Sequence, residues 1–214
     1  MQLSSRTAQR HVKPTLPCWQ CDCKMDRKNA KSHLASLQML YICRRSHSNR
    51  HLSEIICFHN PNEENGYLSN WHPSRFTVRG VAFSSMEQYM MYRKAMCFND
   101  EEVATRILEI DDVGEIKRLG RLVAHYNEHI WSGMWQIEVY EGLVAKFGQN
   151  PDLCAQLDET GNAMLAECAV KDRIWGIGLS MKDHARLDPA LWRGQNLLGY
   201  ALMLARKKSA AHSK

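Results

Sequence analysis

The chain has 214 residues, of which 44% are hydrophobic and 24% charged, with 12 glycines and 6 prolines. This is the composition of an ordinary globular protein that can bury one substantial core, and it excludes collagen-like, disordered and disulfide-framework proteins. No run approaches 18 uncharged apolar residues, so the sequence predicts neither a membrane span nor a membrane partner.

The net charge of +5 is unevenly distributed along the chain. Residues 1–56 hold 10 Lys and Arg against 3 acidic residues, whereas the remaining residues hold 18 against 20. We therefore expect a basic N-terminal arm at residues 1–53, a near-neutral body at 54–208 and a tail at 209–214. The arm could contact phosphates, or it could simply be solvated.

Cysteine and histidine residues in the arm form a possible metal site. Cys18, Cys21, His47 and His51 make a CxxC pair followed by a His-x3-His pair, and thiolates and imidazoles are the ligands that tetrahedral zinc prefers. The gap between Cys21 and His47 is too long for an ordinary zinc finger. Two interpretations stay open: a small knuckle with a structural zinc, or a disordered tail that happens to contain these residues. Metal analysis separates them, because less than about half an equivalent of zinc on the purified protein would exclude the knuckle.

The start of the arm bears on where the protein is located. No apolar signal-peptide core precedes the cysteines, which favours a cytoplasmic protein with reduced thiols. Residues 1–21 carry Arg6, Arg10 and Lys13 and no acidic residue, a composition that mitochondrial presequences share.

The body begins with a predicted short strand at residues 55–59, and Arg79-Gly80 then joins strands at 76–78 and 81–83 as a hairpin. The apolar spacing then becomes helical, with Gly148 expected to end the longest helix and a strand-like segment expected at 173–178. The pattern predicts a body that is mostly helical with a few short strands. Helices are expected at 84–98, 100–110 and 127–147, from 150 onward, from near 162, and at 197–208.

Two residues of the helix predicted at 84–98 could carry chemistry. Glu87 and Lys94 are seven residues apart, so they lie on one helix face, about 10 Å apart along the axis, and could flank a small ligand ring. Glu87 also fits a capping box with Ser84 as the N-cap. Lys94 fits a side chain that reaches the surface from an apolar run, or, if its amine is desolvated, a nucleophile.

Several sequence blocks resemble the NADAR (YbiA-like) family. Residues 66–73, GYLSNWHP, and 83–95, FSSMEQYMMYRKA, match the opening blocks of that family. Later blocks match in order, including LGR at 119–121, DRIWGIG at 172–178 and WRGQNLLG at 192–199. The resemblance spans roughly residues 55–206, and the basic arm has no counterpart in it.

The resemblance implies an α+β fold, a compact and mainly helical single domain with a few short strands like that of YbiA, and an N-glycosidase activity that needs no cofactor for catalysis. Its expected substrates carry ribose on an exocyclic base nitrogen: ADP-ribosylated guanine, or ribosylamine intermediates of riboflavin synthesis. Lys94 would attack the anomeric carbon to form a Schiff base that water releases, and Glu87 would shuttle protons to the leaving base and from water. The implied substrate-binding residues are Asn70, Trp71, Tyr89, Gly120, Arg121, Trp131, Asp172, Trp175, Gly176 and Asn196.

Within that set, Trp71 or Trp175 would stack on the base, Arg121 would contact phosphate and Asp172 the ribose hydroxyls. The sequence departs from many family members at Trp135, where they carry an arginine, and the loss of that charge affects which substrate is expected.

The expected partner is a nucleotide-like small molecule or ADP-ribosylated nucleic acid. The alternatives are a non-catalytic ADP-ribose- or NAD-binding module, and a nucleic-acid-associated zinc protein acting through its arm.

If the arm delivers the enzyme to a polymeric substrate, deleting residues 1–53 should raise the KM for ADP-ribosylated DNA at low salt, because the lost cations no longer attract phosphates. The KM for a modified mononucleotide should stay unchanged. Steady-state kinetics at two salt concentrations measures both, and an unchanged KM for the DNA substrate would contradict a delivery role.

Overall fold

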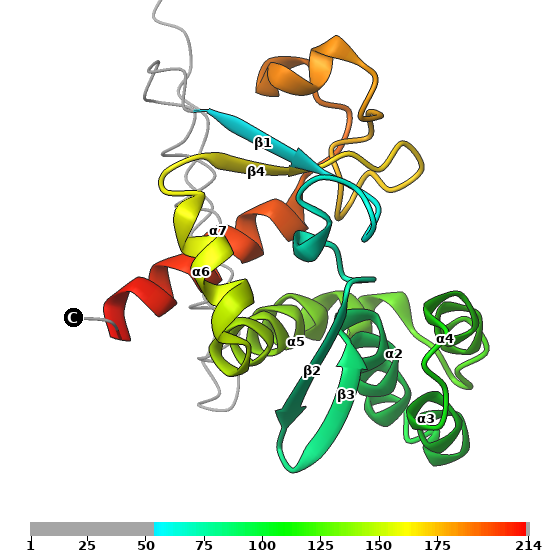
Figure 1. Ribbon diagram of the computed structural model, residues 1–214. Helices are drawn as coiled ribbons and strands as arrows, with labels where there is room; N and C mark the ends of the chain where they lie inside the picture. The colour runs from blue at the N-terminus through cyan, green and yellow to red at the C-terminus, as the bar shows by residue number, and fades with distance from the viewer. Residues whose placement is uncertain (1–53, 213–214) are drawn as a thin grey trace, which may run out of the picture.

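The computed structural model describes residues 54–212 of the chain (Figure 1). The zinc ligands expected at Cys18, Cys21, His47 and His51, and the presequence expected at the N-terminus, lie outside these residues.

Two small sheets form the β-structure. Strand β1 (Ile55–Phe58) pairs in parallel with β4 (Met164–Glu167), so that Phe58 lies opposite Glu167. Strands β2 (Pro73–Val78) and β3 (Val81–Ser85) form an antiparallel hairpin. Its turn residues Arg79 and Gly80 have φ of 52° and 81°, and two positive φ angles are what a two-residue type I′ turn requires. The hairpin predicted from the sequence is confirmed.

The helices make up most of the fold, and α5 lies at its centre. Helix α5 (Glu128–Gln149) packs against α2 (Met86–Cys97), against α7 (Leu197–His212) and against β2. Figure 1 shows the hairpin with α2 on one side of α5, and the β1–β4 pair with α7 on the other. The remaining helices are α3 (Glu101–Leu108), α4 (Val113–Gly120), α6 (Pro151–Glu159) and the short 3-10 helices η1 (Gly66–Leu68), η2 (His184–Leu187) and η3 (Pro189–Leu191). The α+β, mainly helical class is confirmed.

Some element predictions were wrong in detail. Helix α5 runs through Gly148 to Gln149, and Asn150 ends it by donating Nδ2 hydrogen bonds to the carbonyls of Lys146 and Arg75. The segment near residue 162 is not a helix but leads into β4, whose partner β1 lies more than a hundred residues away in the chain. Residues 173–178 form a loop rather than a strand, and α4 was not predicted.

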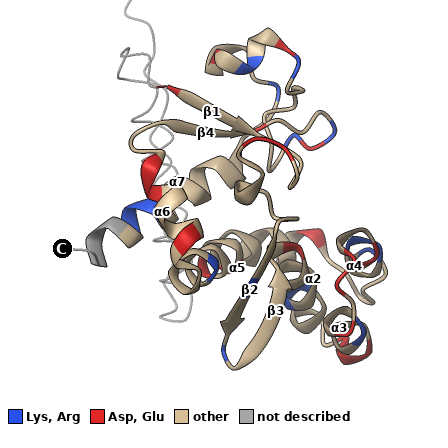
Figure 2. Ribbon diagram, in the orientation of Figure 1, with Lys and Arg blue, Asp and Glu red and all other residues tan. Residues whose placement is uncertain are grey.

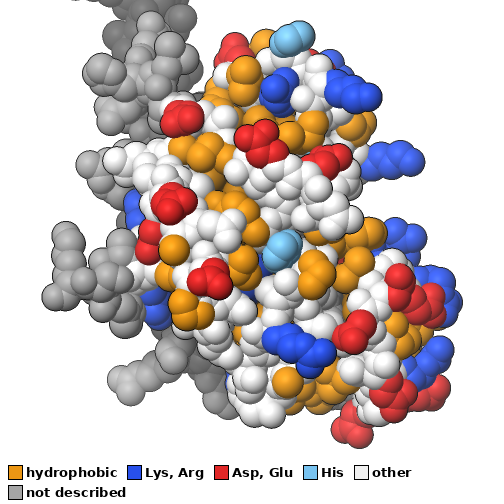
Figure 3. All heavy atoms as spheres, viewed as in Figure 1, with side chains coloured by type: hydrophobic (Ala, Val, Ile, Leu, Met, Phe, Trp, Pro, Cys, Tyr) orange, Lys and Arg blue, Asp and Glu red, His pale blue; other side chains and the backbone are white. Residues whose placement is uncertain are grey.

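Both signs of charge are spread over the surface of this body. Figure 2 shows acidic and basic residues on the same helices, and on the face drawn in Figure 3 neither sign forms one continuous patch. On this face, too, positive and negative side chains are mixed, in keeping with the near-zero net charge of the body. No helix within residues 54–212 combines the length and the apolar character that crossing a bilayer would require.

One lysine lies inside the core. Lys146 is fully buried on α5, and its Nζ donates hydrogen bonds to the carbonyls of Tyr67 at 2.7 Å and Ser69 at 3.2 Å. Burial lowers the pKa of Lys146 to about 7, because removing the charged amine from water is costly. These two bonds tie α5 to η1 and to the residue that follows it.

The substitution Lys146→Met should lower the free energy of unfolding by about 1–3 kcal/mol at pH 9, because the Tyr67 carbonyl loses its partner inside the protein. In the wild type the pKa is lower in the folded state than in the unfolded state, so the unfolded chain binds the extra proton between pH 7 and pH 10.5. Wild-type stability relative to the variant should therefore rise with pH through that window, by up to about 1.4 kcal/mol per pH unit. Urea unfolding at pH 7, 8 and 9 measures this, and a pH-independent difference would contradict it.

Candidate active site

A cavity of about 250 Å³ opens where the two halves of the fold meet. Its wall is built by four regions: the segment after η1, one face of α2, the end of α4, and the end of β4 with the loop that follows. Charged side chains of both signs face this one space. The lining residues are Ser69, Asn70, Trp71, Glu87, Met90, Met91, Lys94, Lys117, Gly120, Arg121, Glu167, Asp172 and Trp175.

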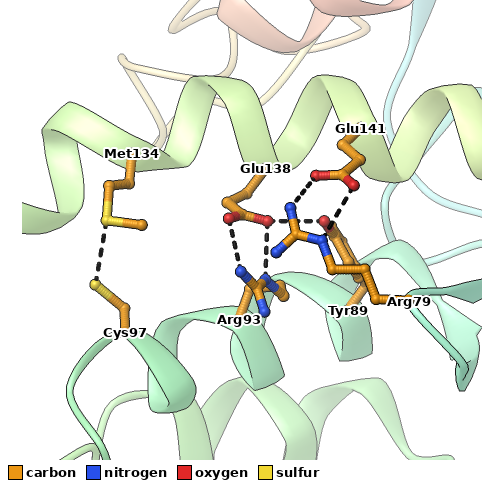
Figure 4. A network of polar contacts seen from close by, with 7 residues as sticks. All are labelled: Arg79, Tyr89, Arg93, Cys97, Met134, Glu138 and Glu141. Carbon is orange, nitrogen blue, oxygen red and sulfur yellow. Dashed lines mark hydrogen bonds and ion pairs between the residues drawn. The ribbon is translucent and has the colours of Figure 1, made fainter. Parts of the chain in front are cut away.

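The orientation of α2 is set by contacts on its other face. Tyr89 and Arg93 point toward α5, where both donate hydrogen bonds to the buried carboxylate of Glu138 at 2.8–2.9 Å (Figure 4). Burial opposes ionisation of Glu138, but these hydrogen bonds outweigh it and hold the pKa of Glu138 below its usual value. With this face turned to α5, Glu87 and Lys94 are turned into the cavity.

The helix cap differs from the expected one, and the difference frees Glu87. Ser85, not Ser84, is the N-cap of α2, and its Oγ accepts from the backbone N–H of Gln88. Gln88 in turn accepts from the N–H of Ser84 at 2.7 Å. The capping box is thus shifted by one residue from the predicted one. Glu87 takes no part in it.

Glu87 is a buried acid facing the cavity. It is 4% exposed, and within residues 54–212 no hydrogen-bond donor reaches its Oε1. Desolvation raises the pKa of Glu87; Lys117, a hydrogen bond with the Trp71 side chain, and Arg121 oppose that rise, while Asp172 adds to it. A carboxyl group with a raised pKa and a free oxygen can exchange protons with a bound molecule.

Lys94 lies on the same wall with its amine half-buried. Its Nζ donates to the carbonyl of Gly120 at 2.7 Å and sits 4.0 Å from the centre of the Tyr126 ring. Desolvation lowers the pKa of Lys94; Arg121 lowers it further, while Glu128 opposes the shift. The amine therefore does not project into bulk water, and no carboxylate within residues 54–212 forms a salt bridge with it. A neutral amine so placed can act as a nucleophile.

The end of α4 supplies the facing wall. A Cβ on Gly120 would lie 2.0 Å from Met91 Sδ, so only glycine lets α4 approach α2 closely enough for its carbonyl to meet Lys94. Arg121 follows at the helix end, exposed at the cavity rim. Lys117, one turn earlier, lies 5.4 Å from the Trp71 ring centre and was missed by the sequence analysis because α4 itself was missed.

The segment after η1 brings Asn70 and Trp71 to the cavity. The Asn70 carbonyl accepts from the N–H of Glu87 at 2.9 Å, which joins this segment to the start of α2. The Nδ2 of Asn70 contacts Met90 Sδ, while its Oδ1 is buried without a donor among the described residues. That oxygen is available to a donor on a bound molecule.

The loop after β4 completes the site. Asp172 accepts from the N–H groups of Ile174 and Trp175 through one oxygen, Oδ1, and this turn places the Trp175 ring against the cavity. Trp135 is 8% exposed and packs edge-to-face on Trp175, with ring centres 4.0 Å apart. Trp135 therefore supports the cavity wall and offers no stacking surface of its own.

Glu167 is a lining residue that the sequence analysis did not select. It ends β4, directly after the buried run Met164–Ala166, and its Oε2 has no donor among the described residues. Desolvation raises the pKa of Glu167 to about 8; Asp172 and Glu87 add to the rise, and Lys117 opposes it. The sequence did contain an indication, because Glu167 is the one acidic residue at the end of an apolar strand. It was overlooked because this segment was predicted to be a helix.

Four residues expected to bind substrate do not line the cavity. Tyr89 is fully buried with its hydroxyl on Glu138, and Trp131 packs against the cluster formed by α3 and α4. Gly176 and the fully buried Asn196 support the end of β4: a Cβ on Gly176 would lie 2.8 Å from the Glu167 carbonyl, and Asn196 bonds to the backbone of Leu165 and Glu167. Sequence spacing could not separate these supporting residues from lining ones.

No group of three or more His, Cys, Asp or Glu side chains within residues 54–212 is arranged to hold a metal ion.

Comparison with known proteins gives one consistent result. The model of the NADAR domain family matches residues 57–209. An N-glycosidase of Acanthamoeba polyphaga mimivirus is 38% identical over 164 residues, which cover 73% of this chain and 96% of the viral protein. A riboflavin biosynthesis protein of Vibrio vulnificus is 31% identical over 163 residues, 76% of this chain and 40% of that protein. The NMR structure of Escherichia coli YbiA, a protein named an N-glycosidase, superposes with a TM-score of 0.63 at 27% identity, covering 75% of this chain and 88% of that one.

Asn196 should affect stability rather than substrate affinity. Asn196→Ala removes two buried hydrogen bonds and places alanine at φ 55°, so the free energy of unfolding should fall by about 2–4 kcal/mol. Asn196→Gly removes the same bonds without backbone strain and should lose less. Urea unfolding measures both variants. An unchanged unfolding midpoint together with a raised KM would instead indicate that Asn196 contacts substrate.

Proposed function

This chain belongs to the NADAR domain family and is a hydrolase acting on N-glycosyl bonds, and we propose that it cleaves the bond between ribose and an exocyclic base nitrogen. The substrates are ADP-ribosylated guanine or ribosylamine intermediates of riboflavin synthesis. In both, the sugar is attached to an amine outside the base ring, so one reaction centre can serve either.

The observation that carries the proposal is the presence of an amine and a buried acid in one cavity. Lys94 and Glu87 come from the same face of α2 and both line the space. Burial lowers the pKa of Lys94 and raises the pKa of Glu87, so it favours the neutral form of both side chains. An amine that loses its proton more readily than usual and a carboxyl group that keeps its proton to higher pH can serve as nucleophile and proton carrier.

The lysine amine performs the bond exchange in this mechanism. The lone pair of the exocyclic nitrogen opens the ribose ring to an imine, which leaves C1 electrophilic. The neutral Lys94 amine adds to C1, the base departs with its nitrogen, and the sugar stays on Lys94 as a Schiff base. Water then adds to C1 and releases the sugar. Glu87 exchanges protons with the reacting groups beside it.

The surrounding residues fit the parts of such a substrate. The Trp175 and Trp71 rings, on opposite segments of the wall, can stack on the base, and Arg121 at the rim can pair with a phosphate. The free oxygens of Asn70 and Asp172 can accept from ribose hydroxyls. The basic arm adds a possible phosphate contact that would favour a polymeric substrate.

Lys94→Ala and Glu87→Gln should each reduce kcat by at least about 100-fold while the fold is kept, because the first removes the nucleophile and the second a proton carrier. The assay compares ADP-ribosylated guanosine with a ribosylaminopyrimidine phosphate and follows release of the sugar by mass spectrometry. Lys182→Ala, an exposed lysine outside the cavity, is the matched control. Normal turnover by Lys94→Ala would exclude the Schiff base, and tight binding of ADP-ribosylated guanosine by the wild type without turnover of either compound would indicate a binding module.

A further inference from the structure

The cavity contains a second carboxyl oxygen without a donor, and it comes from a different element than α2. Glu87 presents Oε1 from α2 and Glu167 presents Oε2 from the end of β4, and neither oxygen has a donor among the described residues. The reaction proposed above needs protons to move at two places, the departing base nitrogen and the lysine nitrogen. One carboxyl group on one wall is poorly placed to serve both.

We propose that Glu167 is a catalytic residue that donates a proton to the departing base nitrogen, while Glu87 exchanges protons with Lys94. This division rests on the proposed function. It follows from which wall each group occupies and from the rigid mounting of Glu167.

The backbone of Glu167 is held on both sides. Its N–H donates to Asn196 Oδ1 at 3.1 Å, and its carbonyl accepts from the N–H of Ile177 at 2.8 Å. Gly176 packs where any side chain would meet the Glu167 carbonyl. The next residue, Cys168, donates its N–H to Phe58 on β1. Because the backbone of Glu167 is fixed by these contacts, its side chain is positioned without hydrogen bonds to the carboxyl group, whose Oε2 stays available to a bound molecule.

The charges around Glu167 favour its protonated form. The groups that face it are Asp172, Glu87 and Lys117: two acids raise its pKa and one cation lowers it. Desolvation raises the pKa of Glu87, and two cations, Lys117 and Arg121, together with the hydrogen bond with Trp71, oppose that rise. Asp172 is already engaged, because its Oδ1 accepts from two backbone N–H groups. Desolvation, with Asp172 and Glu87, raises the pKa of Glu167 to about 8, so Glu167 holds a proton at neutral pH and can act as the acid.

The proton balance closes over one turnover. As Lys94 adds to C1 it gives a proton to the Glu87 carboxylate, which passes it to the imine nitrogen of the base. Glu167 gives its proton to the same nitrogen as the C1–N bond breaks, that bond's electron pair stays on the base, and the base leaves as an amine while the sugar remains on Lys94 as a protonated Schiff base. Water then adds its hydroxyl to C1 and its proton to Glu167. The proton of the new C1 hydroxyl passes through Glu87 to the lysine nitrogen as the C1–lysine bond breaks, so all three groups regain their starting state.

The test compares Glu167→Gln with wild type on ADP-ribosylated guanosine and on a ribosylaminopyrimidine phosphate. We expect kcat on the substrate that the wild type accepts to fall by about 100-fold or more, the range of general acid catalysis. The exposed Glu109→Gln is the matched control and should keep full activity. Glu167→Asp should recover part of kcat, and in wild type kcat should decrease as pH rises through about 8, where Glu167 loses its proton.

A second readout separates catalysis from folding. The terminal ribose of free ADP-ribose carries no base at C1, so its aldehyde form condenses with Lys94 by losing water rather than a base, and cyanoborohydride traps the Schiff base irreversibly during a long incubation. Glu167→Gln should keep this adduct, seen as a mass increase on the Lys94 peptide, whereas Lys94→Ala should lose it. Loss of both turnover and adduct in Glu167→Gln would make its role structural and overturn the proposal, as would turnover within threefold of wild type. A wild type that turns over neither substrate would overturn the proposed function and this inference together, while a wild type that turns over but forms no adduct would overturn only the lysine mechanism.

Discussion

The buried carboxylate of Glu138 fixes the helix on which the active site depends. It accepts from Tyr89 and Arg93 of α2, and removing one partner of such a buried ionic group typically costs about 3–5 kcal/mol. Because those two residues occupy one face of α2, its rotation is set and the opposite face, with Glu87 and Lys94, must look into the cavity. A contact between α2 and α5 thus determines which helix face meets the substrate.

The cavity lies at the junction of two parts that fold from distant segments. Helices α2 and α4 contribute the amine and the two other cations, Lys117 and Arg121, whereas β4 and its loop contribute Glu167, Asp172 and Trp175. Desolvation in this shared space lowers the pKa of Lys94 and raises the pKa of Glu87 and of Glu167, the last to about 8, which favours the neutral forms that proton transfer needs. The charge of Lys117 opposes the rise in pKa of both Glu87 and Glu167.

Local patterns predicted much of the fold but not all of the site. The hairpin at Arg79-Gly80 was readable because its turn chemistry is local, and α2 because its spacing is helical. The capping box was placed one residue early, since Ser84 and Ser85 both fit and only the Gln88 side chain decides between them. Strand β4 was mistaken for a helix because its stability comes from pairing with β1, a contact of long sequence separation.

The sequence by itself determined the class of fold, the helix shared by Glu87 and Lys94, and the blocks that carry the family resemblance. These follow from periods of two and 3.6 residues and from short motifs, which are properties of neighbouring residues. Only the tertiary structure decided that Glu167 and Lys117 line the cavity and that Tyr89 and Asn196 support it from behind. Whether a polar side chain lines a cavity or braces its wall depends on the direction in which distant segments pack, and no local pattern encodes that direction.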